Sequence, residues 1–344
     1  MKEAKVFSRL HSAQDAVPEG TKASDIYLRP GYTALEAGWL DGKAMAIAIE
    51  LDGTDIWVPL IERHTPAGNT DWTSPYGYPW NGPALVTAEG SVVLREIALL
   101  ADNEGVSSVF LRSSPRPSGP QRIETSAMPV GSGSYSVRLV NNTHSISLGQ
   151  PDILARYSSG IRRDVRRAMR EPLVASIQTE WDPETILGLY IDSLNRLEAS
   201  SYHYFSARYL SALQEIGGND QFLSIVRDDS GALLSFGLFF SASPVAQYHI
   251  SAGDSKHKLR GYATKLMIHT AAMECQARDC SELHLGGAPT STTGLDDLKR
   301  RFGTQTNDYF VAEIIPNSTR YEAELQACEA EVSDVRFPRY RGGE

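Results

Sequence analysis

The spacing of apolar residues in the second half of the chain predicts alternating strands and helices. Short apolar runs between turn-forming residues are typical of buried strands, and apolar residues every three or four positions are typical of helices packed on one face. Asp182-Pro183 and Ser206 are placed to begin two of the helices, and Gly217-Gly218 to end the second of them. The predicted strands are 221–227, 232–241, 245–251, 281–285 and 308–315, and the predicted helices are 182–200, 206–217, 261–278, 294–302 and 318–332.

The first half of the chain carries the same kinds of signal, but fewer of them. The alternating runs 43–51 and 55–61 are joined by Asp52-Gly53-Thr54, which predicts a tight hairpin. Segment 69–83 is rich in Gly, Pro and aromatic residues and is predicted to be a loop, whose aromatic side chains either line a pocket or plug the end of a sheet. Helices are predicted at 32–40 and 87–103, strands at 107–112 and 135–140, a turn at Asn141-Asn142, and irregular chain at 1–30 and from Phe337 onwards.

Composition and charge narrow the class of protein. The 344 residues are enough for two domains of ordinary size, and a hydrophobic content of 41% with 22% charged residues is ordinary for a globular protein. No apolar run is long enough to span a membrane, and the first eight residues lack the apolar segment of a secretory signal, so we expect a cytoplasmic protein. Cys275, Cys280 and Cys328 lack the spacing of a metal site, so no metal is expected.

Two short basic segments stand out because the net charge of the whole chain is −9. That net charge excludes general electrostatic binding of nucleic acids, so any polyanion must be held by a local patch. Segment 160–171 is predicted to be a helix with Ile161, Val165 and Ala168 facing inward. Its other side is either a solvated basic face or a surface that contacts phosphates, such as those of RNA. This side consists of Arg162, Arg163, Arg166, Arg167 and Arg170.

The second basic segment, 256–264, lies between the strand 245–251 and the helix 261–278. A strand, a basic glycine turn and a helix in this order predict a phosphate site, because free backbone N–H groups and the positive end of the helix point at the anion. We therefore expect the donor substrate to be bound by Lys256, Lys258, Arg260, Gly261, Ala263 and Thr264.

The order of these elements resembles the GNAT acyltransferase fold. In that family the donor pyrophosphate lies on a Gln/Arg-x-x-Gly-x-Gly/Ala turn, and the matching residues here are Lys258-Leu-Arg-Gly261-Tyr-Ala263, with lysine at the first position. A second likeness is to the FemAB/FemX-type transferases. It rests on Tyr248–Gly253, on Leu285-Gly-Gly287, on the segment Gly294-Leu-Asp-Asp-Leu-Lys299-Arg-Arg-Phe-Gly303, and on the loop Pro75-Tyr-Gly-Tyr-Pro79.

This resemblance implies an α/β (α+β) architecture of two tandem GNAT-like domains. Each would have a mixed, mostly antiparallel sheet flanked by helices: residues 1–150 as a domain that has lost its donor site, and 151–344 as the domain that carries it. It also implies transfer of an amino acid from aminoacyl-tRNA to the amine of a peptide-like acceptor, in cell-wall synthesis or antibiotic tailoring, by a monomer without a cofactor. Two alternatives stay open: an N-acyltransferase that uses acyl-CoA, and a non-catalytic protein that binds tRNA or a peptide.

Candidate catalytic residues follow from the helix 294–302 and the strand 245–251. Leu295, Leu298 and Phe302 repeat on one side of the helix, which places Lys299 at the edge of the apolar stripe, where it can reach a cleft and stabilise an oxyanion or a terminal phosphate. Tyr248 is expected to orient the attacked carbonyl. His249 is either a general base or a packed strand residue. The expected acceptor-binding residues are Asp71, Tyr76, Tyr78, Arg196, Tyr202 and Tyr204.

Overall fold

The computed structural model describes residues 6–12, 25–118, 125–242, 244–287, 293–328 and 336–342. Contacts divide the chain into two compact units, unit 1 (residues 1–140 and 308–344) and unit 2 (residues 141–307). The division differs from the predicted boundary after residue 150, because the chain returns to unit 1 after unit 2 is complete. The strand that begins at Gln305 pairs with a strand of unit 1 between Val311 and Ile314, so the last part of the chain belongs to that unit.

Unit 1 is built on a mixed sheet whose strands follow the order β1-β2-β3-β4-β5-β14. Neighbouring strands are antiparallel except β4 and β5, which run parallel. The hairpin β2–β3 turns at Asp52 and Gly53, both with positive φ, as the Asp-Gly pair predicts. The strands are β1 (Val6–Ser12), β2 (Lys43–Leu51), β3 (Thr54–His64), β4 (Thr70–Thr73), β5 (Val106–Arg112), β6 (Arg116–Pro117), β7 (Thr125–Val130), β8 (Gly133–Ser147) and β14 (Gln305–Ile315).

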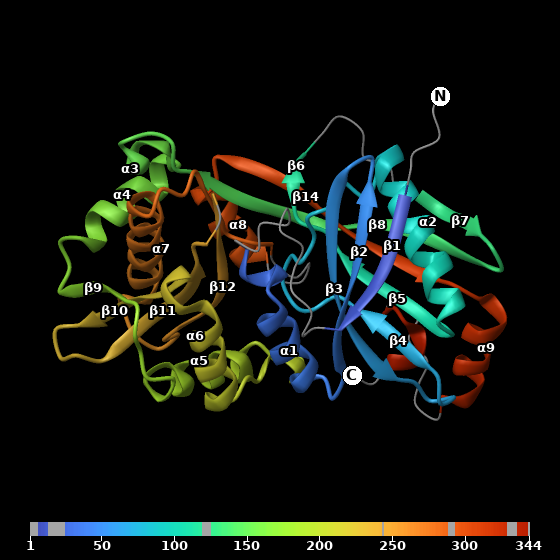
Figure 1. The fold of residues 1–344 in the computed structure, drawn as a ribbon. Helices are drawn as coiled ribbons and strands as arrows, with labels where there is room; N and C mark the ends of the chain where they lie inside the picture. The colour runs from blue at the N-terminus through green and yellow to red at the C-terminus, as the bar shows by residue number, and fades with distance from the viewer. Residues whose placement is uncertain are drawn as a thin grey trace. The chain divides into compact units, whose positions relative to one another are not determined.

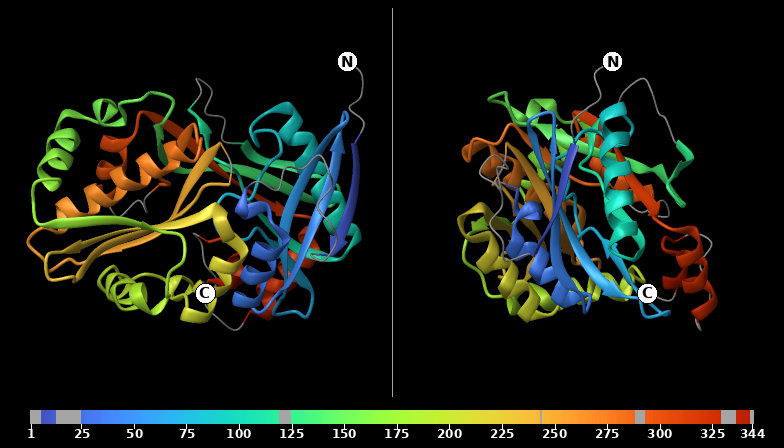
Figure 2. Two further views of the ribbon diagram at one scale, coloured as in Figure 1. Left: turned by 60° about the vertical axis from the view of Figure 1, so that its left-hand side comes forward. Right: turned by 45° about the vertical axis from the view of Figure 1, so that its right-hand side comes forward.

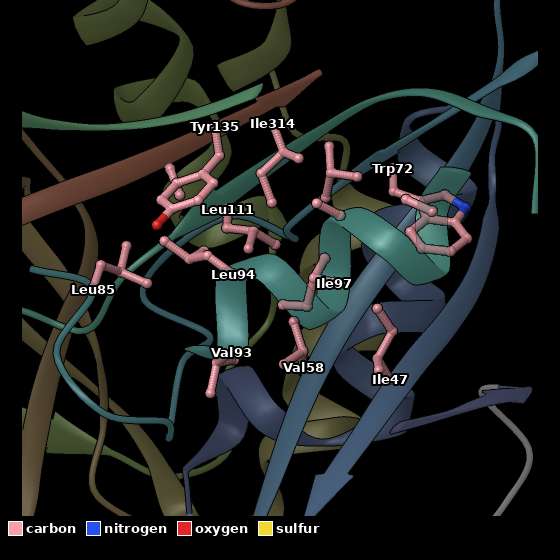
Figure 3. Packing of buried hydrophobic residues seen from close by; sticks show 14 of the residues in the cluster. Ile47, Val58, Trp72, Leu85, Val93, Leu94, Ile97, Leu111, Tyr135 and Ile314 are labelled. Atoms are coloured by element: carbon pink, nitrogen blue, oxygen red, sulfur yellow. The ribbon is translucent and has the colours of Figure 1, made fainter. Parts of the chain in front are cut away.

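The core of unit 1 lies between this sheet and helix α2 (Ala88–Asn103). Val93, Leu94 and Ile97 of α2 are buried, and Figure 3 shows them among side chains of the strands, including Val58 and Leu111. Each fully buried aliphatic side chain contributes about 1.5–3 kcal/mol to stability relative to an exposed one. The other helical segments are η1 (Ile26–Leu28), α1 (Pro30–Trp39), α9 (Ser318–Ala327) and η4 (Arg339–Arg341).

The C-terminal segment is anchored to unit 1 and is not the loose tail that the sequence predicts. The Glu324 carboxylate of α9 is fully buried and accepts hydrogen bonds from the side chains of Thr65, Asn69 and Ser107 and from the Ala67 N–H, at 2.7–2.8 Å. Further on, Tyr340 is buried, and its hydroxyl lies 2.7 Å from that of Ser108. Residues 329–335, which include the end of the predicted helix 318–332, lie outside the described residues.

Unit 2 has its own mixed sheet, in the order β13-β12-β11-β10-β9, with the last residues of β8 paired to β13. The pair β12–β13 is parallel and the others are antiparallel. Helix α7 covers one face of this sheet (Figure 1), and α5 and α6 cover the other face (Figure 2). The strands are β9 (Leu173–Gln178), β10 (Gln221–Asp228), β11 (Leu233–Phe240), β12 (Val245–Gly253) and β13 (Glu282–His284).

The helices of unit 2 follow the predicted pattern of apolar positions. Ile161, Val165 and Ala168 of α4 are buried in the core of this unit, and Ser206 caps α6 through its side chain. Cys275 and Cys280 are buried free thiols. The helical segments are α3 (Ile153–Arg156), α4 (Ser159–Ala168), α5 (Glu184–Arg196), η2 (Ser201–His203), α6 (Ala207–Gly217), η3 (Gly218–Asp220), α7 (Arg260–Ala277) and α8 (Thr293–Phe302).

Five strands are absent from the prediction, and β8 is much longer than predicted. The segments predicted to be irregular chain or loop contain β1 and β4, and β6, β7 and β9 were not recognised. Asn141 and Asn142 continue β8 and do not form a turn. β1 and β9 are stabilised by β2 and β10, which lie far away in sequence, and a pairing of that kind leaves no local signal.

Candidate active site

The site begins where the parallel strands β12 and β13 separate. Their last paired residues are Gln247 and His284, whereas β12 continues to Gly253. Beyond His284 the chain bonds to β8 instead: the Leu285 N–H donates to the His144 carbonyl at 2.8 Å. One edge of β12 therefore has no paired strand from Tyr248 onwards among the described residues, and an unpaired strand edge of this kind can hydrogen-bond to a ligand.

A β-bulge lies at the start of this released segment. Leu238 of β11 pairs with Ile250 and Phe239 pairs with Tyr248, so His249 is the extra residue. The imidazole packs against the Phe240 ring, and burial, with a smaller contribution from His203, lowers the pKa of His249 to about 3. Of the two roles left open by the sequence, the geometry favours the packed strand residue over the general base.

Lys299 lies in α8 with its side chain buried. Its Nζ donates to the Gly287 carbonyl at 2.5 Å and lies 5.8 Å from the centre of the Tyr248 ring. Burial lowers the pKa of Lys299 to about 8, and the charge of Asp296 partly opposes that shift. The two predicted catalytic residues, Lys299 and Tyr248, are thus neighbours. Lys299 is buried, whereas the sequence predicted that it lies at the edge of the apolar stripe of its helix.

Two glycines hold the turn that receives Lys299. Gly286 has a φ of +73°, which favours glycine. At Gly287 a Cβ would lie 2.7 Å from the Asn141 side chain, so no larger residue is accommodated without a shift. The backbone conformation at Gly286 and the close neighbour at Gly287 therefore explain why both positions are glycine. This explanation does not depend on any likeness to other proteins.

Tyr248 is held in place by stacking. Its ring lies on that of Phe239 with 4.7 Å between centroids. Burial raises the pKa of Tyr248 well above its usual value, so the phenol stays protonated at neutral pH and can donate to a carbonyl oxygen.

A buried polar network under the site was missed by the sequence analysis. The His284 imidazole bonds to Gln247 at 2.9 Å and to Thr143 at 2.8 Å, and burial, together with the charges of Lys299 and His144, lowers the pKa of His284 to about 3. Both ring nitrogens of His284 are hydrogen-bonded. This neutral histidine therefore has a structural role next to the opening and is not placed to transfer protons. The only sequence signal was a histidine at the end of a predicted strand.

A second missed contact supports α8. The His144 Nε2 lies 3.2 Å from a carboxylate oxygen of Asp296, one helical turn before Lys299. His144 is nearly buried, whereas Asp296 is about half exposed. This bond fixes the first turn of α8 to β8 and so contributes to the placement of Lys299.

The N-terminus of α7 is open. Its N-cap residue, Leu259, makes no side-chain capping bond, and the backbone N–H groups of Lys258 and Gly261 donate to no acceptor in the described part of the chain. Lys256, Lys258 and Arg260 are exposed beside them. Of the other predicted donor residues, Ala263 is buried and the Thr264 hydroxyl bonds to the Arg260 carbonyl.

The equivalent helix of unit 1, α2, has a closed N-terminus. Its N-cap, Thr87, accepts a hydrogen bond from the Gly90 N–H, and a Cβ at Gly90 would lie 2.2 Å from the Ala84 carbonyl oxygen. The parallel pair β4–β5 is also extended, because Ser74 bonds to the backbone of Phe110 and of Arg112. These contacts extend the strand pair and cap the start of α2, whereas in unit 2 the strands separate and α7 has no side-chain cap.

The basic face of α4 adjoins α7. Lys265 of α7 forms an ion pair with Asp164 at 2.8 Å, and the Arg167 guanidinium lies 4.9 Å from the Tyr262 ring centre. Arg163 and Arg167 also pair with acidic side chains, and Arg162 donates to the Ala155 carbonyl. Arg166 and Arg170 are exposed and form no ion pair with any described residue. The two basic segments of the sequence therefore lie close together on unit 2.

The predicted acceptor residues divide between the units. In unit 2, Arg196, Tyr202 and Tyr204 lie on α5 and the connection to α6; Arg196 bonds to Ser193, and the Tyr204 hydroxyl bonds to Asn195. In unit 1, Tyr76 and Tyr78 lie half-buried in the loop after β4.

Asp71 has a different role from the one predicted. It is completely buried, and its carboxylate accepts from Arg63 at 3.0 Å, from Arg341 at 2.6 Å and from the Tyr340 hydroxyl at 3.3 Å. No oxygen faces solvent where an acceptor amine can reach it. Asp71 is therefore an internal anchor for the C-terminal segment.

Two other classes of site are absent from the described ranges. No group of three or more His, Cys, Asp or Glu side chains there is placed to hold a metal ion. None of the helices in those ranges combines the length and the apolar character that a membrane crossing requires.

Comparison with known proteins identifies the fold. No protein-family model matches the sequence, and no curated protein matches it. A crystal structure of FemX is similar over 81% of this chain and 90% of that chain, with a TM-score of 0.59 and 12% identity. A conserved protein of unknown function from Bacteroides thetaiotaomicron is similar over 88% of this chain and 98% of that chain, with a TM-score of 0.54 and 12% identity.

These structures confirm the predicted FemX-like fold, with mixed sheets flanked by helices. A tandem GNAT protein from the clavulanic acid biosynthesis pathway also matches, at a TM-score of 0.46 and 11% identity, over 90% of this chain and 98% of that chain. At 12% identity the likeness shows the fold alone.

Proposed function

We propose that this protein is a transferase that moves an amino acid from aminoacyl-tRNA to the amine of a peptide-like acceptor. The observation that carries the proposal is the placement of Lys299, a buried cation beside Tyr248 at the opening between β12 and β13. The resemblance of the sequence to FemAB/FemX-type transferases and the FemX-like fold support the same reaction class.

The reaction makes few demands on acid–base groups. The neutral acceptor amine attacks the ester carbonyl of the aminoacyl-tRNA, an amide C–N bond forms, and the C–O bond to the ribose breaks. The proton lost by the amine ends on the released ribose hydroxyl. Lys299 stabilises the oxyanion that develops during the attack, and the Tyr248 phenol orients the carbonyl. No covalent enzyme intermediate is needed.

The tRNA is expected to lie across the basic segments of α4 and α7. Substituting both Arg166 and Arg170 with Gln should weaken tRNA binding and reduce the salt dependence, with the slope of log K against log salt falling by about one per lost phosphate contact. These two side chains have no ion-pair partner among the described residues, so the fold should be unaffected. Filter binding of bulk tRNA from about 50 to 200 mM salt measures the slope.

The matched control for this variant is Arg95→Gln, an exposed arginine on α2 of unit 1. The control should bind tRNA with the wild-type salt slope. An unchanged slope in the double variant would remove α4 from the tRNA surface and leave its arginines as a solvated face.

The direct test of the proposed function is transfer from a mixture of radiolabelled aminoacyl-tRNAs, with cell extract supplying acceptors. Label should move to a small product, and ribonuclease treatment of the charged tRNA should abolish the transfer. Fractionation of the product then identifies the amino acid. No labelled product from any charged tRNA, with a panel of peptide acceptors also tested, would refute the proposal.

A second candidate is an N-acyltransferase that uses acyl-CoA, and the open N-terminus of α7 favours it. The two unused N–H groups and the adjacent lysines suit a pyrophosphate. Acetyl-CoA should then raise the melting temperature through linkage. Transfer from the thioester, without transfer from tRNA, would replace the first candidate by this one.

Gly261→Ala tests whether either donor approaches this helix end. Gly261 is exposed, and an added Cβ would have no neighbour within 4 Å, so the substitution should stabilise the protein by about 0.4–1 kcal/mol. The methyl group would lie where a phosphate must approach the N–H, and donor binding should weaken on the order of tenfold. Calorimetric titration with acetyl-CoA, filter binding of charged tRNA and thermal unfolding measure these effects; unchanged binding of both donors would exclude contact at this glycine.

A further inference from the structure

Arg112 is the last residue of β5 in unit 1 and is half-buried. Its guanidinium donates to the Ser74 carbonyl at 2.6 Å, lies 3.5 Å from the Pro75 carbonyl and 5.0 Å from the centre of the Phe110 ring, and its charge acts on Tyr309 to favour the ionised phenol. Within the described residues it forms no ion pair with a carboxylate. A guanidinium has five N–H donors, so these neutral partners leave both its charge and part of its donor capacity unmatched.

Tyrosine hydroxyls gather beside this cation. Tyr78 and Tyr309 pack edge to face with 5.2 Å between ring centres, and Tyr76 is close enough to Arg112 for the charge to favour ionisation of its phenol. Burial outweighs that effect and raises the pKa of Tyr76 to about 12; burial also raises the pKa of Tyr309. Both phenols therefore keep their protons at neutral pH and can donate hydrogen bonds.

The loop that carries two of these tyrosines is held rigidly. The Tyr76 N–H donates to the buried Glu36 carboxylate at 3.0 Å, and the Tyr76 carbonyl accepts from Tyr32. Gly77 has a φ of +87°, and a Cβ there would lie 2.3 Å from the Tyr27 ring, so the backbone packs directly on that ring. Fixed donors around a cation lower the entropic cost of binding, because little has to be ordered when the ligand arrives.

An anion is the ligand class that this arrangement recognises. A partly buried cation without a counter-charge is unfavourable, and an oxyanion removes that cost while it accepts charge-assisted hydrogen bonds from the guanidinium and the phenols. The site is not a second donor site, because Ser74 closes the strand pair and Ala84 lies against the N-terminus of α2.

We propose that Arg112, Tyr76 and Tyr309 form a subsite in unit 1 that binds the carboxylate or phosphate group of the acceptor substrate. The subsite itself stands on unit 1 alone; its assignment to the acceptor rests on the proposed transferase function. Substrate specificity would then depend on Arg112 and Tyr309, neither of which the sequence analysis singled out. The acceptor is then an amine that also carries an anionic group.

The test measures binding without donor or turnover, so its outcome is independent of the transfer assay. Protein with carbon-13-labelled tyrosine rings is titrated with glycylglycine, with glycylglycinamide and with inorganic phosphate, and the ring resonances are followed by NMR. Glycylglycine, phosphate or both should shift the Tyr76 and Tyr309 resonances saturably, and the two anions show whether a carboxylate or a phosphate is preferred. Glycylglycinamide, which lacks the carboxylate, should bind at least tenfold more weakly than glycylglycine if the carboxylate is the recognised group.

Variants assign the binding to this cluster. Arg112→Gln should weaken anion binding at least tenfold, and Tyr309→Phe should weaken it without removing the bond from Arg112 to Ser74. Arg95→Gln should bind like the wild-type protein, and thermal unfolding checks that each variant is folded. The inference is overturned if neither anion shifts these resonances, or if the folded Arg112→Gln and Tyr309→Phe variants bind the anions with wild-type affinity.

Discussion

Lys299→Met should lower kcat by about 10²–10³-fold while the protein stays folded. A preorganised cation that stabilises a developing oxyanion has an effect of that size, and the rest of the opening between β12 and β13 does not depend on the ammonium group. Tyr248 stays stacked on Phe239, and His284 keeps both of its hydrogen bonds. Turnover in the transfer assay, with circular dichroism as the check on folding, measures the effect.

The same substitution should change how stability depends on pH. Burial disfavours the charged form of Lys299, so its pKa falls from 10.5 when unfolded to about 8 when folded. Between those values the unfolded chain binds more protons, and stability rises with pH by up to about 3 kcal/mol. Below pH 8 the full cost of burying the charged form of Lys299 is present. Lys299→Met should lack this rise, which denaturant titrations from pH 7 to 10.5 detect.

Lys299→Arg is the matched control, because arginine keeps its charge throughout this pH range. If turnover depends on the positive charge of Lys299, the wild-type rate should fall as pH rises through about 8. The arginine variant should not show that fall. Equal turnover of the folded methionine variant and the wild type would show that Lys299 has no part in the reaction. A protein that binds tRNA or peptide without turnover would show no rate effect and would fit only the binding-only alternative.

Asp71→Asn should cost about 3–5 kcal/mol of stability, because it leaves Arg63 and Arg341 buried without their shared carboxylate. Tyr340 would also lose a hydrogen-bond acceptor. Urea unfolding followed by tryptophan fluorescence measures the loss. The exposed Asp55→Asn on β3 is the control and should change stability by less than about 0.5 kcal/mol.

This result also separates two roles for Asp71. An anchor changes stability and leaves the affinity of the folded protein for an acceptor unchanged. A variant of wild-type stability that binds the acceptor less well would restore the role expected from the sequence.

The apolar pattern predicted the parts of the fold that depend on neighbouring residues. Ile161, Val165 and Ala168 fall on one face of α4 because helix geometry alone brings them together, and all three are buried. The Asp52-Gly53 turn fixes the hairpin of β2 and β3 in the same local way. Such features are readable from one stretch of sequence.

The features that escaped prediction depend on residues far apart in the chain. β1 carries a mixed pattern and is a strand because it pairs with β2, and β9 is a strand because it pairs with β10. Asn141 and Asn142 read as turn residues, but pairing on both sides of them keeps β8 extended. Local propensity was overridden by tertiary pairing in each case.

The candidate site shows the same division. Lys299 could be selected from its place on a helix and from the likeness of its surrounding motif. Its burial, its bond to Gly287 and its neighbour Tyr248 depend on the turn after β13 and on β12. His144 and Asp296 are more than a hundred residues apart, so no spacing rule could pair them. Arg112 ended a predicted strand and had no signal of its own.

The return of the chain to unit 1 has a consequence for the order of folding during synthesis. Residues 141–307 form a continuous segment, so unit 2 has its whole sequence before the ribosome reaches Asp308. Unit 1 lacks β14, the Glu324 carboxylate and the Tyr340 segment until unit 2 has been synthesised, although most of its residues emerge first. The usual order, in which the N-terminal domain folds first, is therefore reversed for the final step. Until then, β5 presents an unpaired edge that a chaperone or a second nascent chain can bind.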